Sequence, residues 1–178
     1  MQLKNSTLFK DKSYINGKWV ESKSGKRFDV IGKFYFSLVF INTTNCDLDP
    51  GNGKVFGTCP TNTTDDVDGA VTTAHEAFLT YRKLNPRKRA QLLMKWHTLI
   101  RENQDDIAQI LTHETGKPLA EAHGEIDYSA GFVWWFAGEA ERVRGTVAQP
   151  AIDNRRVFTI KQPIGVAAAL VPWNFPVA

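Results

Sequence analysis

The chain opens with alternating polar and apolar residues, the pattern of short half-exposed strands. Asn16-Gly17, at the centre of YINGKWV, is the dipeptide that most strongly favours a two-residue hairpin turn, and Phe28 and Val30 follow with a period of two. The pattern predicts a small antiparallel unit over residues 14–31.

Apolar residues then recur every three or four positions, which is the period of amphipathic helices. Thr64, followed by two aspartates, predicts the first helix start, and Asn85-Pro86 predicts the second. The predicted apolar face of the first helix contains Val67, Ala70, Val71, Ala74, Phe78 and Tyr81, and that of the second contains Leu92, Leu93, Trp96, Leu99 and Ile100.

Two further helices are predicted. A short one covers residues 105–115 and stops at Gly116, and Pro118 opens a long one that should end near Gly145. The long helix places small or apolar residues on one face, namely Leu119, Ala122, Ile126, Ala130, Val133, Ala137 and Ala140. It also carries glycines seven residues apart, Gly124, Gly131, Gly138 and Gly145, for which we expect close packing against another backbone.

The pattern changes after this helix. Residues 156–161 alternate like a half-exposed strand, Pro163 ends it, and residues 165–171 are apolar on both faces, as in a central parallel strand. Such a strand needs helices on both sides, and none follow in the sequence. We therefore expect an α/β fold and the N-terminal part of a larger protein.

Composition narrows the class of protein. The chain has 178 residues, of which 42% are hydrophobic and 23% are charged, with a net charge of +3, values that favour a globular domain and argue against nucleic-acid or membrane binding. The polar N-terminus lacks a signal core, and Cys46 and Cys59 have no metal-site spacing. We expect a cytoplasmic rather than mitochondrial protein without a metal.

Residues 172–176, PWNFP, are the strongest candidate site, because ligands bind beyond the carboxyl ends of strands in open parallel sheets. Asn174 offers a neutral NH₂ donor that could stabilise an oxyanion, or it could simply cap a turn between two prolines. Cys59 could be a nucleophile, but a small structural cysteine is commoner. His123-Gly124-Glu125 lacks the P-C-x-x-C half of a zinc deaminase site.

Several segments in order resemble the N-terminal third of the aldehyde dehydrogenase superfamily. They are YINGKWV, FDV, DPGNGKVFG, DDVDGAV, ETGKPLAEAHGEI, WWFAGEAERVRG and KQPIGVAAALVPWNFP. WFAGEAERV and the last segment look most like the succinate-semialdehyde dehydrogenase branch. The resemblance implies oxidation of an aldehyde, with NAD or NADP as cofactor, in a homo-oligomer.

The resemblance also implies roles for single residues. Asn174 would be the oxyanion-hole side chain, Pro172, Trp173 and Asn174 would contact the cofactor, and Phe175 would border the aldehyde channel. The family's catalytic cysteine and general-base glutamate match no residue here, so we expect the chain alone to be inactive. The alternative is a non-catalytic module that pairs with full-length subunits through residues 155–162.

By the same resemblance, residues 1–178 form an incomplete aldehyde dehydrogenase domain. Residues 145–163 would be part of the oligomerisation strands, and residues 164–178 would start the cofactor-binding domain.

Residues 32–48 form an atypical insertion, for which we consider a retained intron and an extra strand. Gly32-Lys33 permits a GTAAG donor, Leu48-Asp49 permits a TAG acceptor, and excision restores an aspartate codon in frame. The run GKFYFSLVFI has the residue types of a strand, but its apolar residues do not alternate. We favour the retained intron.

Overall fold

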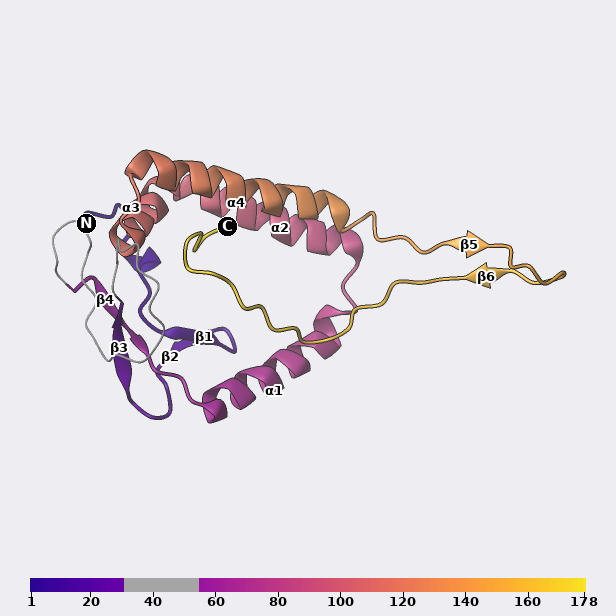
Figure 1. The fold of residues 1–178 in the computed structure, drawn as a ribbon, viewed down its shortest axis with the longest axis horizontal. Helices are drawn as coiled ribbons and strands as arrows, with labels where there is room; N and C mark the ends of the chain where they lie inside the picture. The colour runs from indigo at the N-terminus through magenta and orange to yellow at the C-terminus, as the bar shows by residue number, and fades with distance from the viewer. Residues whose placement is uncertain (31–54) are drawn as a thin grey trace.

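The computed structural model describes residues 1–30 and 55–178 (Figure 1). The N-terminal part contains a 3-10 turn and four short strands in two antiparallel pairs, β1 with β2 and β3 with β4. Their bounds are η1 (Ser6–Leu8), β1 (Ser13–Ile15), β2 (Lys18–Val20), β3 (Arg27–Val30) and β4 (Gly57–Pro60). Asn16 and Gly17 connect β1 to β2 with φ of 51° and 73°, the left-handed pair that a tight hairpin turn requires, so the predicted hairpin is confirmed. The predicted insertion at residues 32–48 lies outside the described residues.

All four predicted helices form, and all but α4 lie close to their expected bounds. They are α1 (Thr64–Tyr81), α2 (Pro86–Glu102), α3 (Gln104–Thr115) and α4 (Leu119–Glu139). Asn85 caps α2 with its side chain, and Gly116 ends α3 with φ of 76°, both as predicted. The cap of α1 is Thr63, one residue before the predicted Thr64.

The start of α1 is tied to the N-terminal strands through Asp66. Its carboxylate accepts hydrogen bonds from the backbone N–H of Thr63 at 2.8 Å, the backbone N–H of Lys23 at 2.9 Å and the Ser22 hydroxyl at 2.8 Å. These donors, led by the Thr63 N–H, hold the pKa of Asp66 well below its usual range. The first turn of α1 and the β2–β3 connection are therefore one hydrogen-bonded unit.

The core lies where α2, α3 and α4 pack together. Its buried residues are Ile100, Ala108, Leu111, Ala122, Ile126, Ala130 and Val133, with Leu93, Ile107 and Val177 packed against them. The small-residue face predicted for α4 is confirmed, since its members from Ala122 to Ala137 are buried. The apolar face predicted for α2 is only partly buried. Ile100 is buried and Leu93 packs on the core, whereas Leu92, Trp96 and Leu99 are exposed.

Helix α4 ends at Glu139 rather than near Gly145, so the predicted end was too late. Gly145 instead begins a hairpin in which β5 (Val147–Ala148) pairs with β6 (Val157–Phe158), and this hairpin projects away from the helices (Figure 1). A Cβ at Gly145 would collide with the Thr159 carbonyl, as close packing predicts. At Gly124 and Gly131 a Cβ would meet nothing among the described residues, so the prediction of close packing was wrong there.

The predicted central strand at residues 165–171 does not form, and β6 is shorter than the predicted strand at 156–161. Leu170 is fully exposed and Val171 is 81% exposed. An extended segment becomes a strand only when a neighbour satisfies its backbone N–H and C=O groups, and no described strand lies beside it. The segment instead returns past α1 toward α2 and α4, where the chain ends (Figure 1).

Candidate functional site: the Asn174 segment on helix α4

Residues 172–177, which contain the candidate motif, lie against α4 and the loop before it. The segment brings together the four residues singled out from the sequence, Pro172, Trp173, Asn174 and Phe175, and all four are exposed. Trp173 is 75% exposed, and among the described residues the Asn174 side chain has no hydrogen-bond partner. Trp173 and Asn174 stand in a turn, and the Asn174 side chain is exposed there.

The main chain of the segment, in contrast, is bound at Asn174 and at Val177. The Lys117 ammonium donates to the Asn174 carbonyl oxygen at 3.1 Å and lies 4.9 Å from the centroid of the Phe175 ring. Val177 donates its N–H to Glu125 Oε1 at 2.8 Å and accepts from the Ser129 hydroxyl at 2.7 Å. The backbone is held while the Asn174 side chain projects free.

Local sequence explains how these partners meet. Gly116 ends α3 in the left-handed conformation and Pro118 caps α4, so Lys117 stands in a short connection between the two helices. Glu125 and Ser129 are one helical turn apart on α4, on its buried face. The α3–α4 connection thus supplies the cation, and α4 supplies the two polar groups, that bind Asn174 and Val177.

Lys117 and Glu125 form an ion pair in which the Glu125 side chain is 1% exposed and the Lys117 side chain 15%. Nearby, burial raises the pKa of Glu114, and the negative charge of Glu125 raises it further. The Lys117 cation is thus the positive charge that balances the buried Glu125 carboxylate.

Sequence reasoning missed these partners. The pattern assigned no contact to Lys117, which simply follows the Gly116 stop, and Glu125 appeared only in a motif that lacks half of a zinc site. The signal that could have revealed Glu125 and Ser129 is their position, because each falls within the run of small and apolar residues that faces the core. A polar residue on such a face needs a buried partner.

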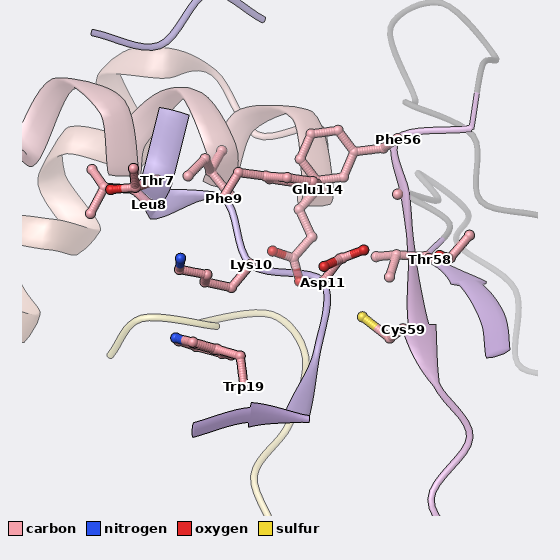
Figure 2. A pocket seen from close by; sticks show the side chains of 13 residues that line it. Thr7, Leu8, Phe9, Lys10, Asp11, Trp19, Phe56, Thr58, Cys59 and Glu114 are labelled. Carbon is pink, nitrogen blue, oxygen red and sulfur yellow. The ribbon is translucent and has the colours of Figure 1, made fainter. Parts of the chain in front are cut away.

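A separate cavity of about 390 Å³ lies between the N-terminal segment, β4 and α3 (Figure 2). Phe9, Trp19 and Phe56 supply apolar walls, and Glu114 and Cys59 also line it. The lining does not include residues 172–177, so Cys59 does not share a site with Asn174. Cys59 is held in β4 opposite Phe28, which fits a structural cysteine better than a nucleophile.

The remaining candidates have local roles. His123 Nδ1 lies 3.3 Å from the Gln104 amide nitrogen, and no group of three His, Cys, Asp or Glu in the described parts of the chain could hold a metal ion. Within residues 1–30 and 55–178, no helix has both the length and the apolar character to cross a bilayer.

Comparison with solved structures defines the class of fold. A succinate-semialdehyde dehydrogenase from Burkholderia pseudomallei superimposes with a TM-score of 0.86 at 38% identity, over 99% of this chain and 33% of that one. The α/β class expected from the sequence is confirmed, and it matches part of a dehydrogenase fold.

Sequence comparison gives the family. The sequence model of the Aldehyde dehydrogenase family matches residues 42–178. A glutarate-semialdehyde dehydrogenase of Pseudomonas putida is 42% identical over all of this chain and 34% of its own length, and the NADP(+) succinate-semialdehyde dehydrogenase GabD of Escherichia coli is 40% identical over all of this chain and 33% of its own. The chain belongs to the aldehyde dehydrogenase family, and it spans about a third of the length of these relatives.

Proposed function

We propose that this chain is the N-terminal segment of an NAD(P)-dependent aldehyde dehydrogenase that oxidises a semialdehyde, with succinic semialdehyde as the first candidate, to the carboxylic acid. The observation that carries the proposal is the Asn174 segment, whose backbone is held by Lys117 and by Glu125 of α4, while the Asn174 side-chain amide has no partner within the described parts of the chain. A preorganised neutral donor of this kind stabilises the oxyanion that forms when a nucleophile attacks an aldehyde carbonyl.

The roles of the neighbouring residues follow from their exposure. Pro172 and the Trp173 indole would bind the cofactor together with Asn174, and the exposed face of Trp173 suits a planar ring. When bound, the nicotinamide dinucleotide supplies the hydride acceptor. The Phe175 ring, held by Lys117, would border the aldehyde channel and keep water away from the reacting carbon.

The chain on its own should not turn over an aldehyde. Neither Cys46 nor Cys59 matches the family's nucleophile motif, and Cys59 lines a cavity apart from Asn174. We assign residues 145–163 to the oligomerisation strands and residues 164–178 to the start of the cofactor-binding domain. We propose a cytoplasmic location, since two cysteines are too few for the disulfide framework of a small secreted domain.

The projecting β5–β6 hairpin supports a second candidate function, a module that pairs with full-length subunits. Phe158 is 69% and Ile160 is 77% exposed on this hairpin. Co-expression with a tagged full-length relative tests this function. The second function is supported if the tagged relative retains this chain, if Phe158→Lys abolishes that retention, and if the control variant Phe132→Lys on α4 does not.

A chimaera tests the main proposal. This chain replaces the matching third of the E. coli relative, and reduction of NADP⁺ by succinic semialdehyde is followed. Asn174→Ala should lower kcat by about 10²–10³, the cost of one oxyanion donor. Asn154→Gly, in an exposed turn with φ of 62°, is the matched asparagine control and should have no effect. A folded chimaera without turnover, or an Asn174→Ala variant within about threefold of the parent, would refute the proposal.

A further inference from the structure

We infer that Lys117 and Glu125 are positioning residues, which act on the proposed oxyanion donor by fixing the main chain of Asn174. This inference rests on the function proposed for Asn174. It adds two residues that lie 57 and 52 positions before their bonded partners in the chain.

The first step concerns the buried carboxylate. Both Glu125 oxygens are used, Oε2 by the Lys117 ammonium and Oε1 by the Val177 N–H at 2.8 Å. A carboxylate on the core-facing side of a helix, between Ala122 and Ile126, costs desolvation energy, and an apolar residue there would avoid that cost. The two partners of Glu125 explain why a carboxylate stands at this position. One carboxylate orients both the Lys117 ammonium and the returning chain at Val177.

The second step concerns the cation. Lys117 directs one N–H at Glu125 and another at the Asn174 carbonyl, and its charge lies over the Phe175 ring. The bond to the carbonyl fixes the peptide plane that follows Asn174. Fixing that plane restricts the direction in which the Cα–Cβ bond of Asn174 points.

The third step distinguishes the contacts made at Asn174 from those made at Val177. Ser129 and Glu125 bind the C=O and N–H of Val177, and the partly buried Val177 side chain packs on the core. Lys117 alone contacts the chain at Asn174 and Phe175 among these three residues. Loss of Lys117 should therefore loosen Asn174, whereas loss of Ser129 should loosen Val177.

The experiment measures ¹⁵N order parameters in the full 178-residue chain. The parent should give about 0.85 at Asn174 and Phe175, the value of rigid backbone. In Lys117→Met/Glu125→Gln, the glutamine still accepts from the Val177 N–H and no bare charge is left buried. The order parameters at Asn174 and Phe175 should then fall below about 0.6, while Val177 and the α4 amides keep their values.

Three further variants distinguish positioning from general anchoring. Lys117→Arg keeps the charge and donors and should restore the rigid values at Asn174. Ser129→Ala should lower the value at Val177 only, and Lys161→Met, an exposed lysine on the same returning segment, should change nothing.

An Asn174 that is already flexible in the parent, or that stays rigid in the double variant, would overturn the inference, as would an equal effect of Lys161→Met. These outcomes are independent of turnover. Failure of this inference can therefore be told apart from failure of the proposed function, because the proposed function is tested separately by the kinetics of Asn174→Ala in the chimaera.

Discussion

Removing the cation from the Lys117–Glu125 pair should strongly destabilise the chain. In Lys117→Met, the Glu125 carboxylate, whose side chain is 1% exposed, would keep its burial and lose its charge partner. Breaking such a pair from one side costs about 3–5 kcal/mol, whereas replacing both members with apolar residues is often neutral. Since a domain of this size is stable by only about 5–15 kcal/mol, the single variant should lose a large share of its folding free energy.

Urea denaturation followed by far-UV circular dichroism gives the free energy of unfolding for the parent, Lys117→Met, Glu125→Leu and the double variant. The double variant should recover most of the stability lost in Lys117→Met. The four free energies of unfolding together give the coupling energy between Lys117 and Glu125. Lys161→Met is the matched control and should lie within about 0.5 kcal/mol of the parent. A loss below about 1 kcal/mol in Lys117→Met, or a double variant no more stable than that single variant, would refute the reasoning.

Five further outcomes are expected. The lowered pKa of Asp66 means that its stabilisation is complete above about pH 4 and is lost as the pH falls through its folded-state pKa, so Asp66→Asn should flatten the acid limb of a stability–pH curve; an unchanged limb would contradict this. Leu170→Lys should raise solubility, measured by light scattering, because Leu170 is fully exposed in an uncharged apolar run. Gly145→Ala should open the β5–β6 hairpin in hydrogen exchange, whereas Gly124→Ala should stabilise the chain by about 0.5–1 kcal/mol. Genomic sequencing should show splice signals around the codons for residues 32–48, and transcript sequencing should show a mature message that lacks these codons. A dominant message that retains the codons would count against the intron.

Local chemistry predicted most of the elements correctly. The Asn16-Gly17 turn, the Asn85 cap and the Gly116 stop each depend on residues next to them in the sequence, and each forms as predicted. The apolar periodicity of α4 also identified its buried face. These signals are sufficient because a cap, a turn or one face of a helix is specified within a few residues.

The predictions that failed depend on distant partners. Residues 165–171 have the composition of a central strand, but a strand also needs a neighbour, and none of the described strands pairs with them. The end of α4 was placed too late because Gly145 was counted as part of a helical stripe, although its role is to let the Thr159 carbonyl approach. The Asn174 motif was visible in the sequence, whereas its anchors on α4 were not.

The connection between α3 and α4 also limits where this chain can change length. Each residue added to an α-helix rotates all later residues of the helix by about 100° and moves them by about 1.5 Å along the axis. One residue inserted between Lys117 and Glu125 would therefore turn the carboxylate away from the ammonium and from Val177, although every amino acid of the anchor would still be present. Length variation among natural homologues should accordingly avoid residues 117–129 and collect in the hairpin after Glu139.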